Sequence, residues 1–229
     1  MLLGGLQKTT LLDYPSKVAC IVFTKGCNFR CGYCHNPELI NGKEEISLSS
    51  FFDFLDKRKG KLDGVVVTGG EPTIHKDLYE FLLEIHNKGF KIKLDTNGTN
   101  PQMLIKCLPL LDYIAMDIKG PLYKYYDICG IKPNIEDVYE DITIQVYNSV
   151  DIIKNCGISY EFRTTIVEDE LNVEDFKHIN HLLYGAETYY LQRFTPTKTL
   201  DKSYMSRIPP KDMSPFINVL KDIKNVYVR

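Results

Sequence analysis

The sequence contains no apolar run close to the ~20 residues that a membrane-spanning helix requires. Its first residues also lack a basic stretch followed by a long apolar core, so we predict no export signal, a cytoplasmic location and no membrane partner. Concentrated positive charge is missing as well, because 28 Lys and Arg residues are interspersed with 30 Asp and Glu residues. A nucleic-acid groove needs a concentrated positive field, so nucleic acid is not an expected partner.

What is present is typical of a globular chain. Of the 229 residues, 44% are hydrophobic and 25% are charged, which is sufficient for one sizeable core. No Ser/Gly-rich linker or low-complexity segment divides the chain. We therefore expect a single domain over residues 1–229.

Short apolar runs alternate with segments whose apolar residues recur at helical spacing. Ser47 is expected to cap one helix and Pro101 to open another. The expected strands are 18–24, 64–68, 90–96, 113–118, 158–167, 187–194 and, as a strand or tail, 225–228. The expected helices are 48–55, one from 78 that ends at Gly89, a short one from 101, about 135–155, 173–183 and 210–223. About six alternations imply parallel strands with crossover helices, fewer than in a full barrel. The predicted fold is α/β, a partial (β/α)6 open TIM-like barrel.

Two further features concern the loops and the cysteines. The loop 121–134 carries three tyrosines and is a candidate lid or docking loop, although a packed surface loop is the commoner arrangement. The cysteine count is seven, an odd number, and disulfides are not expected without an export signal. Four of the cysteines are scattered and are expected to fill the core as small hydrophobes: Cys20, Cys107, Cys129 and Cys156.

The other three cysteines lie in one short run, Cys27-Asn-Phe-Arg-Cys31-Gly-Tyr-Cys34. Such clustering predicts a metal site. Three thiolates can converge on a [4Fe–4S] cluster and leave one iron without a protein ligand, and a catalytic metal needs such an open position. The alternative is a structural zinc ion completed by His35. Adjacent ligands at Cys34 and His35 are awkward, however, and zinc ribbons pair their cysteines two by two.

This loop follows a predicted strand and carries an aromatic residue, Tyr33, before its last cysteine. In these features it resembles the signature of the radical S-adenosylmethionine (radical SAM) superfamily. The resemblance implies a [4Fe–4S] cluster on the three cysteines, with SAM bound to the free iron. It also implies reductive cleavage of SAM to methionine and a 5′-deoxyadenosyl radical that abstracts a hydrogen atom. Tyr33 joins the expected SAM site through the same resemblance.

Later segments match the family in the same order along the chain. Gly69-Gly70-Glu71-Pro72 looks like the GGE motif that holds the methionine amino group. Two glycines let backbone approach a ligand closely, and a carboxylate can accept from an ammonium. Such a turn alone is more often only a turn; its place after the cysteine loop and a strand strengthens the interpretation.

Asp95 in DTNG and Asp117 and Lys119 in MDIK resemble segments of the activating enzymes of glycyl-radical enzymes. The resemblance implies that both aspartates hold a monovalent cation near the SAM carboxylate and that Lys119 contacts SAM. Independently, side chains at the carboxyl ends of parallel strands point into a barrel mouth, and carboxylate oxygens suit a hard cation. For either aspartate alone, a helix cap or a surface ion pair is the alternative.

Arg163 is expected inside a core strand, where a charge must be paired or line a cavity. The resemblance implies that it binds the SAM carboxylate; a salt bridge inside the barrel is the alternative. Gln192 receives no role, because the pyruvate formate-lyase activating enzymes carry a His near this position.

Residues 5–15 and 34–39 make the chain look like the activating proteins of anaerobic ribonucleoside-triphosphate reductases. This implies that the chain generates a glycyl radical on a partner enzyme and receives electrons from a flavodoxin or ferredoxin. A radical SAM enzyme acting on a small molecule or a peptide is the second hypothesis. A non-enzymatic zinc module is the third, and it leaves Glu71, Asp95 and Asp117 unexplained.

Overall fold

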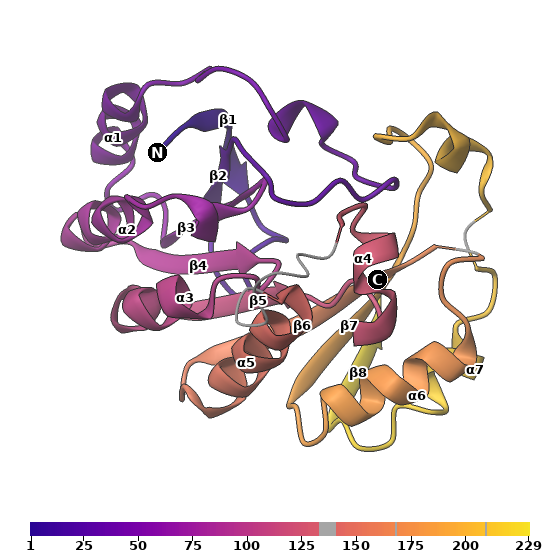
Figure 1. Cartoon of the computed structure of the whole chain (residues 1–229). Helices are drawn as coiled ribbons and strands as arrows, with labels where there is room; N and C mark the ends of the chain where they lie inside the picture. Colours follow the sequence, from indigo (N-terminus) through magenta and orange to yellow (C-terminus); the bar gives the residue numbers. More distant parts are fainter. Residues whose placement is uncertain (133–140, 168, 209) are drawn as a thin grey trace.

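The computed structural model describes residues 1–132, 141–167, 169–208 and 210–229, and they form one curled sheet with helices on its outer side (Figure 1). The strand order follows the chain: β1 (Leu3–Thr10), β2 (Ala19–Thr24), β3 (Gly64–Gly69), β4 (Lys91–Thr96), β5 (Tyr113–Asp117), β6 (Ser159–Ile166), β7 (Thr188–Arg193) and β8 (Asn225–Val228). β1 pairs antiparallel with β2, and each later pair is parallel. β1 and β8 are the two edges of this open sheet, as predicted for a partial barrel.

The crossover helices cover the convex face of the sheet (Figure 1). They are α1 (Leu48–Lys57), α2 (Leu78–Asn87), α3 (Pro101–Cys107), α5 (Ile142–Asn155) and α6 (Val173–Leu182), and the short α7 (Ser214–Ile217) packs beside α6. The short α4 (Tyr125–Ile128) lies instead against the loop 27–34. Ser47 caps α1 by accepting from the Ser50 N–H, and Pro101 stands in the first turn of α3, both as the sequence predicted. No helix of the described ranges is long and apolar enough to cross a membrane.

The apolar faces of α1 and α2 meet over the start of the sheet. The rings of Phe51, Phe52 and Phe81 lie with centroids 5.4 to 5.6 Å apart, and Phe51 and Leu55 are fully buried. Each such aromatic pair contributes about 0.5–1.5 kcal/mol beyond its area burial. The central strands are buried on both faces, which is why they read as continuous apolar runs in the sequence.

The register of the parallel strands places their polar ends together. Asp117 on β5 is the register partner of Arg163 on β6, so both side chains project from the same face of the sheet. Asp95 on β4 pairs with Ala115, two residues before Asp117 and on the same face. The inner face at this edge of the sheet therefore carries two carboxylates and a guanidinium.

Three expectations about secondary structure were wrong. The edge strand β1 was not predicted, because it is half exposed and includes two glycines. The segment 210–223 is helical only in α7, since tertiary hydrogen bonds hold its second half: the Gly185 N–H donates to the Asp222 carbonyl and the Lys224 N–H to the Ala186 carbonyl. The loop 121–134 is helical in part over residues 122–128, and Tyr125 is fully buried. Residues 133–140 lie outside the described residues, as does the expected start of α5.

Candidate active site

A pocket opens at the carboxyl ends of β3 to β6, beneath the loop from Cys27 to Cys34, which we call the cysteine loop. Every site residue that the sequence predicted lines it: Cys27, Cys31, Tyr33, Cys34, Gly69, Gly70, Glu71, Asp95, Asp117, Lys119 and Arg163. Residues separated by up to 136 positions are thus brought to one cavity by the register of the parallel strands. We call the side formed by the cysteine loop and Gly69–Glu71 the cysteine wall, and the side formed by Asp95, Asp117, Lys119 and Arg163 the ion-pair wall.

The three thiols of the cysteine wall are free and differ in their surroundings. Burial raises the pKa of Cys27 to about 11 and also raises that of Cys34. The pKa of Cys31 is lowered, chiefly by a hydrogen bond from the Cys129 thiol. No three His, Cys, Asp or Glu side chains of the described residues converge as one metal ion requires. A [4Fe–4S] cluster takes each cysteine on a different iron, so its ligands need not converge in that way.

The turn Gly69–Glu71 is bonded to the base of the cysteine loop. The Gly70 N–H donates to the Thr24 carbonyl at 2.9 Å, and the Glu71 N–H donates to the Gly26 carbonyl at 2.8 Å. A Cβ on Gly70 would lie 1.9 Å from the Gly26 oxygen, so only glycine permits this approach. These glycines therefore let two segments of the chain's own backbone pack together, whereas the sequence suggested the approach of a ligand.

The Glu71 carboxylate is buried and is fully engaged within the protein. One oxygen, Oε1, accepts from the Thr73 N–H and from the hydroxyls of Thr73 and Thr96. The other, Oε2, accepts from the Asn97 N–H at 2.6 Å. Burial raises the pKa of Glu71, and these neutral donors only partly oppose it. In this structure Glu71 joins the ends of β3 and β4, and its binding of a ligand ammonium stays a prediction.

On the ion-pair wall, Arg163 bridges the two aspartates. Its Nε lies 2.7 Å from Asp117 Oδ1, and its Nη1 lies 3.0 Å from Asp95 Oδ2. Lys119 adds a contact of 3.0 Å to Asp117. Burial alone would raise the pKa of Asp117, but the Arg163 and Lys119 cations outweigh it and hold that pKa well below its usual range. Burial would likewise raise the pKa of Asp95, but the Arg163 and Lys93 cations outweigh it and lower that pKa.

Charge on this wall does not cancel. Lys93 lies 3.2 Å from Asp95 Oδ1, and the buried Glu161 lies 3.8 Å from Arg163 and 2.8 Å from Arg229. Four cations therefore surround three carboxylates in this connected network and leave one surplus positive charge. That surplus suits an anionic group of a ligand. Asp95 Oδ1 is buried and accepts no hydrogen bond from the described residues, although the Lys93 ammonium lies 3.2 Å from it.

Amide side chains connect the cysteine loop to the end of β4. Asn97 donates from Nδ2 to Asn28 Oδ1 at 2.9 Å, and Asn28 donates from its own Nδ2 to the Thr99 hydroxyl at 2.8 Å. The sequence gave no reason to select Asn28, because one polar residue in a loop carries no spacing signal. The contact fixes the cysteine loop against the next strand end.

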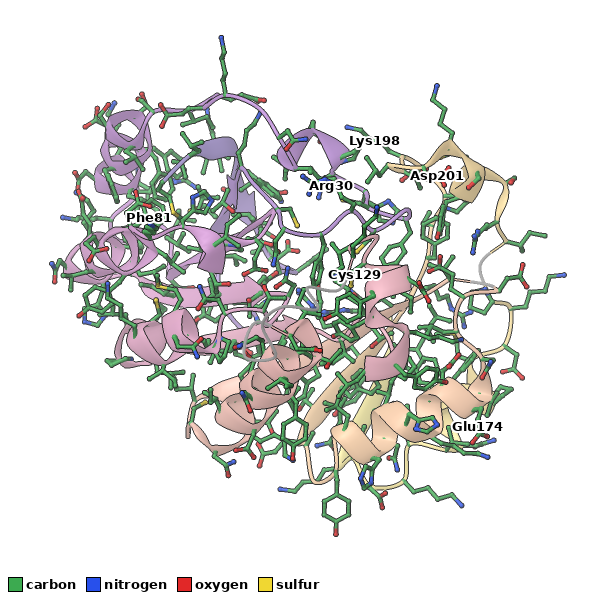
Figure 2. The ribbon with its side chains drawn as sticks, viewed as in Figure 1. Arg30, Phe81, Cys129, Glu174, Lys198 and Asp201 are labelled. Atoms are coloured by element: carbon green, nitrogen blue, oxygen red, sulfur yellow. The ribbon has the colours of Figure 1, made fainter. Side chains whose placement is uncertain are left out.

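A segment after β7 covers the cysteine loop from the other side. The Asp201 N–H donates to the Gly32 carbonyl at 2.9 Å, and the Tyr204 ring occupies the space beside Gly32 that a Cβ would fill. Tyr204 also packs against Tyr33, with ring centroids 6.3 Å apart, and its hydroxyl bonds to Glu170. Asp201 and Lys198 mark this segment in Figure 2. Tyr204 was missed because it contacts the site only through tertiary packing.

The chain belongs to the radical SAM superfamily, whose family model matches residues 21–183. Enzymes of this superfamily use a [4Fe–4S] cluster and SAM, and this chain is a radical SAM enzyme with those cofactors. Three free thiols in one pocket and a wall with surplus positive charge fit the cluster and SAM. When bound, the reduced cluster would supply the one electron that cleaves SAM, and the 5′-deoxyadenosyl part of SAM would supply the radical that abstracts hydrogen.

Several known proteins are also similar to this chain in sequence. A Methanocaldococcus jannaschii protein, provisionally named a glycyl-radical enzyme activating enzyme, is 30% identical over 215 residues, covering 92% of this chain and 87% of its own. The pyruvate formate-lyase-activating enzyme of Clostridium pasteurianum is 31% identical, over 50% of this chain and 51% of its own. A GTP 3′,8-cyclase of Helicobacter pylori is 26% identical, over 87% of this chain and 58% of its own.

Solved structures agree on the fold. The crystal structure of Streptococcus suis SuiB bound to its precursor peptide SuiA superposes with a TM-score of 0.65 at 13% identity. It covers 91% of this chain, while this chain spans 48% of SuiB. At that identity the likeness confirms the open α/β barrel and nothing about the substrate.

Proposed function

We propose that this radical SAM enzyme generates a glycyl radical on a partner enzyme, an anaerobic ribonucleoside-triphosphate reductase. The observation that carries the proposal is the nearly full-length similarity to the Methanocaldococcus jannaschii protein, together with a pocket that holds every predicted residue. The Clostridium pasteurianum enzyme, named for activating pyruvate formate-lyase, supports the same class of partner. The choice of the reductase rests on residues 5–15 and 34–39.

The chain's own residues divide the work between the two walls. Cys27, Cys31 and Cys34 hold three irons of the cluster. On the other wall, Arg163 and Lys119 would bind and orient the SAM carboxylate, as a charge-assisted pair does, and the surplus charge of the network favours it. Tyr33, 95% buried, closes the cysteine wall and excludes water from the radical.

The two aspartates are proposed to keep a monovalent cation beside that carboxylate. Asp95 Oδ1 accepts no hydrogen bond among the described residues, and the cation would take the place of the Lys93 ammonium that lies 3.2 Å from it. The other Asp95 oxygen and Asp117 are engaged by Arg163 and Lys119. Measuring SAM affinity in potassium, sodium and tetramethylammonium chloride at equal ionic strength tests the cation, since a bulky ion cannot enter; equal affinities would contradict it.

The remaining parts of the proposal concern the setting of the reaction. The cluster is reduced from outside by a flavodoxin or ferredoxin, because the reaction consumes one electron. All seven thiols are free, which suits the cytoplasm, where disulfides are rare. The fold forms one sheet with its covering helices, in keeping with a single domain over residues 1–229.

The test is anaerobic incubation of the reconstituted protein with SAM, a reductant and each candidate partner. The expected result is about four irons per chain and a glycyl EPR signal on the reductase. Cys27→Ala is the matched control, and it should abolish both the signal and 5′-deoxyadenosine formation. Stoichiometric zinc without iron would contradict the cluster.

The second candidate function is a radical SAM reaction on a small molecule or a peptide. The similarity to a GTP 3′,8-cyclase over 87% of this chain is the observation that favours it. Both candidates share SAM cleavage, so the discriminating result is the fate of the hydrogen. 5′-Deoxyadenosine that accumulates with a small substrate or peptide, and no glycyl signal on any partner, would favour the second.

A further inference from the structure

The outer edge of β8 is a row of main-chain groups with which no strand of the described residues pairs. Figure 1 shows β8 beside β7 at one end of the curled sheet. On its inner edge, the Asn225 N–H donates to the Glu187 carbonyl and the Arg229 N–H to the Leu191 carbonyl. Alternate residues of a strand turn their N–H and C=O to opposite sides. The intervening residues 226 and 228 therefore present theirs to the open edge.

The side chains of β8 favour pairing with another strand. The strand reads Asn-Val-Tyr-Val and includes neither a charged residue nor a proline. Tyr227 is 49% exposed and Val228 is 38% exposed. Aromatic and β-branched residues suit extended pairing, and proteins usually protect an edge strand with lysine, proline or a covering segment. Among the described residues β8 has none of these protections.

The opposite edge of the sheet, β1, is protected. The N–H groups of Glu45 and Ile46 donate to the Leu3 carbonyl and cover the start of this strand. Its second half carries exposed polar side chains, among them Lys8. The two edges of one sheet thus differ, and β8 is the one suited to accept another chain.

The carboxyl end of β8 lies on the side of the sheet where the pocket opens, because β8 is parallel to β7. Arg229 Nη2 lies 2.8 Å from Glu161 Oε1, and Glu161 lies 3.8 Å from Arg163 of the ion-pair wall. Adjacent strands are about 4.8 Å apart, so a strand outside β8 would lie about 14 Å from β6 along the sheet. At about 3.3 Å per residue, some four residues of extended chain cover that distance.

Two stacked rings lie beside the open edge on the inner face. The Tyr227 ring stacks on Tyr190 with centroids 5.2 Å apart, and the Arg229 guanidinium lies 4.1 Å above the Tyr190 ring. Rings held in this way pack against a neighbouring strand, and an aromatic ring covers the space that a glycine in that strand leaves open. This surface favours a glycine-bearing segment over a second β8.

We propose that β8 is the docking edge for the glycine-bearing segment of the partner enzyme, which adds to the sheet as a ninth, extended strand. Its main chain bonds to the outward groups of Val226 and Val228, and the chain beyond the strand carries the glycine into the pocket. Main-chain bonds supply the affinity in this mode of recognition. The inference deepens the proposed function and rests on it, because a glycyl-radical enzyme is the proposed substrate.

The test removes one outward N–H with Val228→Pro. The neighbouring residues keep their bonds to β7, and an edge strand tolerates proline where the N–H faces outward. Val228→Thr is the matched control, because it keeps both the N–H and a β-branched side chain. The rate of glycyl EPR signal formation is measured against the concentration of the reductase. Val228→Pro should raise the KM for the reductase about tenfold, and Val228→Thr should leave it unchanged.

SAM cleavage by dithionite without a partner is the control for the fold and the cluster. It should be equal in the wild type and both variants, because β8 does not line the pocket. An unchanged KM in a Val228→Pro protein that cleaves SAM normally would overturn the proposal. A wild-type dimer in light scattering that Val228→Pro dissociates would assign the edge to a second copy of the chain instead.

Peptides that carry the reductase's glycine segment give a second measurement. Each is N-methylated on one of the two sets of alternate residues and competes with the reductase. One set should lose inhibition and the other keep it, since only alternate N–H groups face β8. Equal inhibition by both sets would contradict strand pairing. SAM cleavage without a glycyl signal on any partner refutes the proposed function and this inference with it, whereas a glycyl signal with an unchanged KM refutes the inference alone.

Discussion

Glu71 on the cysteine wall and the aspartates on the ion-pair wall are shielded carboxylates of one pocket, but they are held by different partners. Neutral hydroxyl and backbone donors surround Glu71, and its pKa is raised because burial dominates. Cations surround Asp95 and Asp117, and their pKa values are lowered. The difference shows that the Glu71 carboxylate holds neighbouring segments of the chain in place, whereas the ion-pair wall keeps its two carboxylates ionised.

Removing the shared cation of the ion-pair wall should have the largest effect. Arg163→Leu leaves two shielded carboxylates without their common partner, and breaking such pairs costs about 3–5 kcal/mol. Since 30% of the Asp117 side chain is exposed, we expect the lower end, about 3 kcal/mol. Urea unfolding at neutral pH measures it.

The same variant should lose SAM affinity, measured by calorimetry on the reconstituted protein. Lys221→Leu is the control at an exposed cation outside the pocket, and it should stay within about 0.5 kcal/mol of the wild type. Equal stability of the two variants would show that Arg163 does not hold the ion-pair wall together.

On the cysteine wall, Glu71→Ala should cost about 2 kcal/mol, because buried donors from residues 73, 96 and 97 lose their acceptor. Urea unfolding of the apoprotein measures the loss. Glu71→Gln retains one acceptor oxygen and should lose less. A Glu71→Ala variant as stable as the wild type would show that these donors find other partners.

Lowering the pH should change the unfolding free energy contributed by the two walls in opposite directions. The lowered pKa values of Asp95 and Asp117 give stability that is complete above the unfolded value of about 3.9 and is lost as the pH falls below it. Glu71 acts in the opposite direction: its raised pKa costs stability as the pH rises above about 4.3. The wild type should therefore lose unfolding free energy as the pH falls below about 4.

Measuring the unfolding free energy of Glu71→Gln over the same pH series isolates the contribution of the Glu71 carboxylate. Without the opposing carboxylate, its unfolding free energy should rise with pH more steeply than that of the wild type above about pH 4. Parallel curves for the two proteins would mean that Glu71 titrates normally and that the walls do not differ.

The smallest effect is expected where the segment after β7 covers the cysteine wall. Tyr204→Phe removes the hydroxyl that bonds to Glu170 but keeps the ring beside Gly32, so about 1 kcal/mol should be lost. Thermal unfolding measures it, and SAM affinity should not change. Weaker SAM binding would instead show that the hydroxyl helps to order the pocket.

Much of the fold could be predicted because local patterns and tertiary structure agree. Ser47 caps α1 as its spacing predicted, and the buried parallel strands read as apolar runs. The prediction failed where tertiary contacts replaced local preference. The segment 210–223 looked helical, but bonds from Gly185 and Lys224 hold its second half in turns. The edge strand β1 had no strong pattern, since half of it faces solvent.

The sequence by itself determined the superfamily and the residues of the pocket, because ligand spacing within a loop and polar residues at strand ends are local features. Only the tertiary structure decided how those residues are held. It paired Arg163 with both aspartates, turned Glu71 inward onto its own neighbours, and bonded the Cys129 carbonyl to the Arg30 N–H of the cysteine loop. Such contacts depend on register and packing between distant segments, and a single sequence carries no local signal for them.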